Sequence, residues 1–131
     1  MFKWKETYRT GNGAIDLQHL RLFELGTQVH EMLSQKRSED KYDDLVVLLK
    51  ELRDYTVYHF DFEEGMLEAV GYPYLVQHQE EHRRFVEKLD ELAAQDLDAF
   101  QNKVAFEMLG FLANWIERHI LDSDFRYAEY V

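Results

Sequence analysis

The stretch LVVLLKELRDYTVYHFDFEEGM, residues 45–66, carries the pattern that decides the fold. Apolar residues and one histidine recur in it every three or four positions, at Leu45, Leu48, Leu49, Leu52, Tyr55, His59, Phe62 and Met66. This spacing is typical of one face of an amphipathic helix. The run stops at Gly71-Tyr72-Pro73, and a glycine followed closely by proline is a signal that ends a helix.

Three further runs with the same spacing lie on either side of this stretch. Their faces carry, after Asp16, Leu22, Phe23, Gly26, Val29, His30 and Leu33; then Leu75, His78, His82, Phe85, Val86, Leu89 and Leu92; and lastly Val104, Met108, Phe111, Leu112, Trp115, Ile116 and His119. The other two breaks are also short, a charged one at 36–40 and a weaker one around 95–96. Short connections make neighbouring helices antiparallel, so we expect an all-α, up-down-up-down four-helix bundle.

The two ends of the chain fall outside the four runs. Residues 4–14 read as an extended N-terminal arm with a turn at Gly11-Asn12-Gly13, and residues 122–131 as a short C-terminal tail rich in tyrosine. A chain of 131 residues with no internal repeat is long enough for one core, so we expect a single domain over 1–131.

The composition excludes several classes of function. The chain has no cysteine, so disulfides, zinc–thiolate sites, iron–sulfur clusters and thiol nucleophiles are excluded. The net charge of -11 disfavours nucleic acid and anionic membranes as partners, because both bind clustered lysine and arginine. Without a signal peptide, a membrane span or an apolar stripe left for a partner, we expect a cytoplasmic monomer.

Histidines are the strongest functional signal. Five of the six lie on the predicted core faces, namely His19, His59, His78, His82 and His119. The start of the odd helices and the end of the even helices meet at one end of an up-down-up-down bundle, so these five should converge there. Several unpaired buried imidazoles would cost free energy, which indicates that something binds them.

Carboxylates belong to the same cluster. Glu63 follows His59 by four residues and so shares its helix face. Five imidazoles with two carboxylates suit a pair of divalent metal ions, whereas a single four-coordinate zinc would not need seven donors. Spacing leaves the second carboxylate open: Asp122 is three residues after His119, while Asp124 is five residues after it, about 140° around an ideal helix. Asp124 would reach the site only from a distorted last turn.

Taken in order, these motifs resemble the hemerythrin family, in particular the bacterial hemerythrins. The resemblance covers nearly the whole chain. It is carried by Trp4, Tyr8, IDLQH at 15–19, Leu22-Phe23, HFDFEE at 59–64, GYP at 71–73, HQEEH at 78–82, Phe85, WIERHI at 115–120 and Asp124.

The resemblance implies a non-haem di-iron centre and selects Asp124, not Asp122, as its last ligand. The implied ligands are His19, His59, Glu63, His78, His82, His119 and Asp124. The last three histidines would bind one iron and the first two the other, with both carboxylates and an oxo or hydroxo group as bridges. Dioxygen would bind reversibly and end-on at the iron with two histidines, as a hydroperoxide.

A bound hydroperoxide requires an apolar wall against water and protons. Candidate lining residues are Leu22, Phe23, Phe60, Trp115 and Ile116. Trp115, one turn before His119, is the foremost of them. Tyr8 and Tyr127 are candidates for hydrogen bonds near the site. His30 lies about three turns beyond His19, too far to be a ligand, and we interpret it as a core residue or one supporting the ligands.

The leading function is oxygen storage, delivery or sensing by a binding protein that is not an enzyme. Its alternatives are a di-iron oxidase or peroxidase and an iron-handling protein. Ferritin-like oxidases use Glu-x-x-His pairs with further glutamates, and the histidine-rich set here favours reversible binding instead. A purely structural bundle would leave five convergent imidazoles unexplained.

Overall fold

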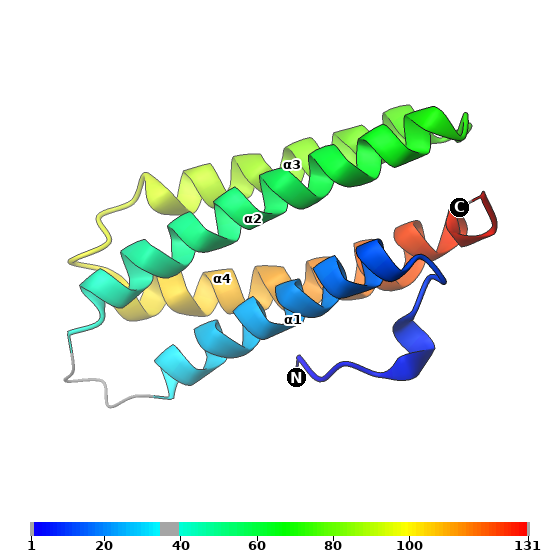
Figure 1. The fold of residues 1–131 in the computed structure, drawn as a ribbon. Coiled ribbons are helices and arrows are strands. Elements are labelled where there is room, and N and C mark those ends of the chain that lie inside the picture. Colours follow the sequence, from blue (N-terminus) through cyan, green and yellow to red (C-terminus); the bar gives the residue numbers. More distant parts are fainter. Residues whose placement is uncertain (1, 35–39, 131) are drawn as a thin grey trace.

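The computed structural model describes residues 2–34 and 40–130, without the side chain of residue 117. Every regular element in these residues is a helix. In chain order they are η1 (Glu6–Tyr8), α1 (Gly13–Leu33), α2 (Tyr42–Ala69), α3 (Leu75–Ala93), α4 (Gln101–Trp115), the π-helix η2 (Ile116–Asp124) and η3 (Ala128–Tyr130). Consecutive long helices run in opposite directions (Figure 1), which confirms the all-α, up-down-up-down four-helix bundle.

Helix α1 begins earlier than the sequence pattern predicts, at Gly13 instead of after Asp16. The reason is the side chain of Asn12, whose oxygen accepts hydrogen bonds from the backbone N–H groups of Ala14 at 3.1 Å and Ile15 at 3.2 Å. These donors have no partner inside the helix, and an asparagine cap satisfies them. The first turn, with its buried Asp16, is therefore already helical.

The N-terminal arm is only partly extended, because Glu6–Tyr8 form a turn of 3-10 helix. Of the expected turn at Gly11-Asn12-Gly13, only Gly11 bends the chain, with a φ of 96°, because Asn12 caps α1 and Gly13 is its first residue. Asp16 fixes the end of the arm, since its Oδ1 accepts hydrogen bonds from the backbone N–H of Thr10 at 2.8 Å and from its hydroxyl at 2.9 Å.

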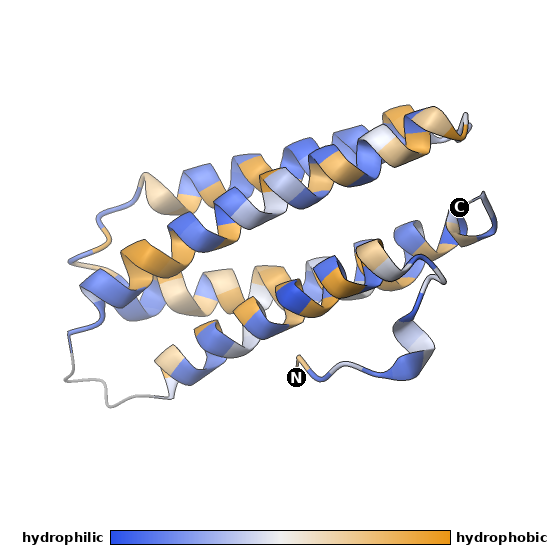
Figure 2. Cartoon of the chain, in the orientation of Figure 1, coloured by the Kyte–Doolittle hydropathy of each residue, from blue (hydrophilic) through white to orange (hydrophobic). Residues whose placement is uncertain are grey.

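Hydrophobic and hydrophilic residues alternate in bands along the long helices in Figure 2, and the core is built mainly from buried apolar side chains. The sequence pattern placed Phe62 and Met66 of α2 in the core, and this prediction is wrong. Phe62 is 40% exposed and Met66 is only half-buried, while Glu63 and Leu67 are buried. At about 100° per residue, Phe62 lies roughly a quarter-turn from the centre of the buried face. The face therefore continues from His59 in steps of four residues, not three.

The connections agree with the predicted breaks where they are described. Residues 94–100 separate α3 from α4, in place of the weak break expected around 95–96. Most of the charged break expected at 36–40 lies outside the described residues. The α2–α3 connection turns on Gly71, which has a φ of +68°, and Tyr72 N–H donates to the carbonyl of Leu67 across the end of α2.

The turn at Gly71 gives a direct test of the fold. We expect Gly71→Ala to lower the free energy of unfolding by about 1 kcal/mol, because an L side chain is strained at positive φ. Gly110→Ala in the interior of α4 is the matched control and should raise it by about 0.5–1 kcal/mol. Apart from the adjacent residues and the local helix backbone, a Cβ at either position meets no atom within 4 Å, so the backbone conformation separates the two variants. Urea unfolding measures both; equal effects would contradict the turn.

Candidate metal centre

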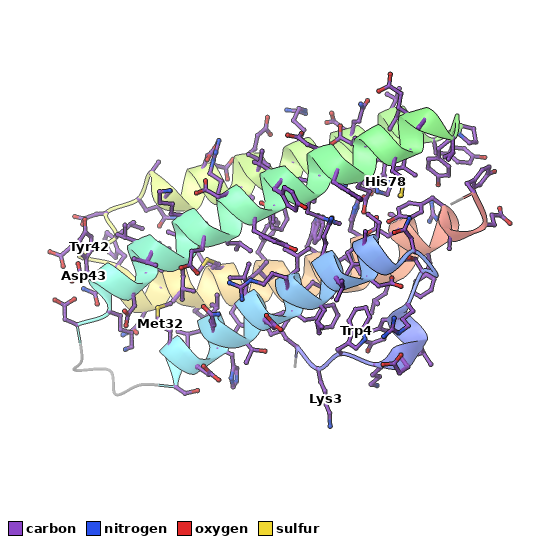
Figure 3. All side chains as sticks on the ribbon, viewed as in Figure 1. Lys3, Trp4, Met32, Tyr42, Asp43 and His78 are labelled. Carbon is purple, nitrogen blue, oxygen red and sulfur yellow. The ribbon has the colours of Figure 1, made fainter. Side chains whose placement is uncertain are left out.

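Seven polar side chains meet inside one end of the bundle, where α1 and α3 begin. Figure 3 shows one of them, His78, pointing from α3 into the interior. None of the seven is more than 3% exposed. They are His19 of α1, His59 and Glu63 of α2, His78 and His82 of α3, and His119 and Asp124 of η2. Every ligand that the family resemblance implies therefore lies in one cluster.

The cluster consists of two overlapping donor sets. The first set holds Glu63, His78, His82, His119 and Asp124, and the second holds His19, His59, Glu63 and Asp124. Within each set, one donor atom from every residue lies within 4.8 Å of all the others. Only the two carboxylates belong to both sets, which is the arrangement that a pair of bridged metal ions needs.

Glu63 divides its two carboxylate oxygens between the sets. Its Oε1 lies 2.6 Å from Nε2 of His78 and 3.0 Å from Nε2 of His82. Its Oε2 lies 3.3 Å from Nε2 of His59 and 3.7 Å from Nε2 of His19. One carboxylate therefore faces both halves of the site at once.

Asp124 divides its oxygens in the same way, with Oδ1 2.8 Å from Nε2 of His78 and 3.1 Å from Nε2 of His119, and Oδ2 2.9 Å from Nε2 of His19. It reaches the site because Ile116–Asp124 form a π-helix, in which residues five apart come into line. Asp122, the alternative that spacing left open, is exposed and bonded to Arg126 at 2.9 Å.

Several buried atoms of the cluster lack a hydrogen bond. They are Nδ1 and Nε2 of His19, Nε2 of His59 and both carboxylate oxygens of Asp124. Some lie close to groups of opposite charge but are not aligned with them for hydrogen bonding. In addition, Nε2 of His82 and Nε2 of His119 face each other at 3.1 Å. Buried polar atoms without partners are costly, and cations between these donors would satisfy them, so the residues fit a metal centre.

The protonation of the metal-free cluster follows from the two carboxylates. Burial alone would raise the pKa of Glu63, but the imidazoles around it, His119 first, hold that pKa well below its usual range. Burial would lower the pKa of His19 and His78, yet contacts with Asp124 and Glu63 raise each to about 9. The pKa of His59 is instead lowered by its burial. The two carboxylates thus outweigh the effect of burial at His19 and His78.

Two aromatic rings stack on imidazoles of the first set. The ring centroids of Phe60 and His82 are 3.9 Å apart with an angle of 7° between the ring planes. Those of Trp115 and His119 are 4.3 Å apart with an interplanar angle of 18°. The other pocket candidates, Leu22, Phe23 and Ile116, are buried in the main apolar core. The site is therefore walled by hydrocarbon on the side of the bundle centre.

Three other residues singled out in the sequence have different outcomes. Tyr127 is buried and its hydroxyl donates to Oε2 of Glu63 at 3.0 Å, and burial raises its pKa well above the usual value. Tyr8, in the arm, packs its ring on Trp4 and on Phe23 of α1. The interpretation of His30 as a core or supporting residue is wrong: it is exposed near the far end of α1, because the buried face there follows Val29 and Met32.

Sequence patterns missed three residues that contact the imidazoles from outside. Gln18, Glu64 and Glu81 each place a side-chain oxygen within 2.9 Å of a histidine Nδ1. Each is directly adjacent to a ligand candidate in the sequence. All three also lie inside motifs that carry the family resemblance, IDLQH, HFDFEE and HQEEH, but nothing in the pattern assigns them a role, because polar residues on a helix are ordinarily solvated.

None of the helices in the described part of the chain is both long and apolar enough to cross a membrane.

Comparison with known proteins agrees with this geometry. The family model described as hemerythrin HHE cation binding domain matches residues 10–131. A bacteriohemerythrin of Clostridium acetobutylicum is 36% identical over 129 residues, 98% of this chain and 100% of that protein. A bacteriohemerythrin of Pseudomonas aeruginosa is 31% identical over 130 residues, 98% of this chain and 80% of that protein. The chain therefore belongs to the hemerythrin family.

Proposed function

We propose that this chain, acting as one domain over 1–131, binds dioxygen reversibly at a non-haem di-iron centre and is a binding protein, not an enzyme. The observation that carries the proposal is the pair of buried donor sets that share two carboxylates. The relatives named bacteriohemerythrin, and the family's description as cation-binding, support it. Two iron ions, when bound, supply the two electrons that dioxygen takes up and gives back.

The donors suit iron in number and kind. Imidazole nitrogen binds iron well, and carboxylate oxygen bridges two hard ions. The ligands we assign to one iron are His78, His82 and His119, and those assigned to the other are His19 and His59. Glu63 and Asp124 are the proposed protein bridges, together with an oxo or hydroxo group.

The two halves differ in their number of donors, five in one and four in the other. We therefore place dioxygen at the half with His19 and His59, which has one donor fewer. The apolar residues Leu22, Phe23, Phe60, Trp115 and Ile116 are the proposed wall that excludes water from the site. Excluding water strengthens electrostatic interactions and suppresses side reactions at a reactive centre.

An oxidase or peroxidase is the alternative from another functional class. Ferritin-like di-iron proteins use a glutamate three residues before each of two ligand histidines. No histidine in this chain has a glutamate at that position. The histidine-rich donor set thus supports reversible binding over oxidase chemistry.

Reversibility is the first expected outcome. The iron-loaded, chemically reduced protein should gain visible absorption when exposed to air and lose it again under argon. Absorption spectra recorded over several cycles measure this. A colour that never disappears under argon would exclude reversible binding and favour the oxidase.

The ligand assignment predicts iron content. His119→Ala should lower the iron content toward one ion per chain, because it removes one donor from the five-donor set. His30→Ala is the matched control: it removes an exposed histidine and should leave two ions bound. Metal analysis of the purified variants decides, and full iron loading of His119→Ala would remove that residue from the ligand set.

The metal-free protein should lose stability as the pH rises. Because the pKa of His19 and of His78 is raised from 6.5 to about 9 on folding, their stabilisation is complete below pH 6.5 and disappears as the pH passes 9. Bound metal replaces these protons, so the loaded protein should keep its stability over the same window. Urea midpoints at pH 6.5 to 9.5 compare the two forms. A parallel decline with and without metal would contradict this exchange.

A further inference from the structure

Two imidazoles of the five-donor set contact a carboxylate through Nδ1, the ring nitrogen that points away from the other donors. Oε2 of Glu64 lies 2.9 Å from Nδ1 of His82, and Oε2 of Glu81 lies 2.6 Å from Nδ1 of His119. Glu81 is itself oriented by Ser123, whose hydroxyl donates to Oε1 at 3.2 Å. Neither glutamate belongs to either donor set. Both therefore act on the site only through the imidazoles they contact.

The four-donor set has a partner of a different kind. Oε1 of Gln18 lies 2.6 Å from Nδ1 of His59, and Gln18 is only 6% exposed. The Nδ1 of His19 makes no hydrogen bond. In the four-donor half, a neutral amide therefore contacts one imidazole Nδ1, whereas in the five-donor half carboxylates contact two.

The difference has a chemical consequence at the inner nitrogens. An imidazole that gives Nε2 to a metal carries its proton on Nδ1, so the group facing Nδ1 accepts a hydrogen bond. An anionic acceptor draws that proton and makes Nε2 a stronger electron donor, while an amide only fixes the ring. The five-donor half thus has more ligands and the more basic ones.

We infer that Glu64, Glu81 and Gln18 are positioning residues that make the two metal positions unequal. The five-donor position binds its metal first and more tightly because two of its imidazoles are backed by carboxylates. The four-donor position, with His59 backed by Gln18, binds later and more weakly and keeps the poorer electron donors. This inference rests on the proposed function in one respect, the presence of two metal positions.

The test is a titration of the full-length, metal-free protein with Zn²⁺, which has no redox chemistry. Calorimetry with a competing chelator should resolve two unequal binding steps. Glu81→Gln or Glu64→Gln should weaken the tight step roughly 10- to 100-fold and leave the weak step unchanged. Gln18→Met, which removes the acceptor from His59, should weaken only the other step by a similar factor.

Glu80→Gln is the matched control for these variants. Glu80 is adjacent to Glu81, but it pairs with Arg83 and Arg84 on the surface and contacts no imidazole of the cluster. The same charge removal there should leave both steps unchanged. An equal loss in Glu80→Gln would mean that net charge alone sets the affinity, which overturns the inference.

A spectroscopic readout separates positioning from a loss of structure. In the Zn²⁺-loaded protein, the Nδ1 proton of His119 should give a strongly shifted NMR signal that moves in Glu81→Gln and stays in Glu64→Gln. The signal of His82 should behave in the opposite way. Signals that do not respond to their own partner would overturn the assignment even if every variant folds.

The outcomes also distinguish this inference from the proposed function. Equal Zn²⁺ steps in the unmodified protein, or variants that weaken both steps alike, overturn the inference and leave dioxygen binding untouched. Unequal steps that respond as expected uphold it, even if the iron-loaded protein fails to bind dioxygen reversibly. Binding of one Zn²⁺ per chain would also overturn the inference, whereas the iron content of the loaded protein tests the proposed function separately.

Discussion

Two fully buried carboxylates, Glu63 and Asp124, are the constraint on which the rest of the structure depends. An isolated charge in a protein interior costs several kcal/mol, and breaking its pairing leaves that cost uncompensated. Five imidazoles from four helical elements surround the two charges, and protons or cations complete the balance. The leucine-rich core fixes the positions of these helices relative to one another, so that their imidazoles lie at the same end of the bundle. Fold and site are therefore one problem, because no single helix could supply the cluster.

Much of this arrangement could be predicted from the sequence, because it depends on two simple rules. Helical periodicity located four amphipathic runs, and short connections made them antiparallel. Topology then placed the histidines at one end, where the structure has them. The position of Asp124 could not be predicted in this way. Periodicity assumes a regular α-helix, whereas His119 and Asp124 come together only because the backbone widens into a π-helix.

The other wrong predictions from the sequence have a related origin, since a sequence pattern does not show how the helices pack against one another. Phe62 and His30 lie at the margins of apolar faces, where the crossing of neighbouring helices decides which residues are covered. Gln18, Glu64 and Glu81 look like solvated polar residues in the sequence. Their contacts with the imidazoles exist only once α1, α2, α3 and η2 are packed together.

The side chains that contact the imidazoles also differ in their exposure to solvent between the two halves of the site. The side chains of Glu64 and Glu81 are 25% and 45% exposed, so a titratable group links water to each of two imidazoles in the five-donor half. Gln18 cannot titrate and is nearly buried, so it offers the other half no such link. A reactive ligand is best kept where protons do not arrive readily. The same three side chains that we infer to make the metal positions unequal thus also support our proposed placement of dioxygen at the half with His19 and His59.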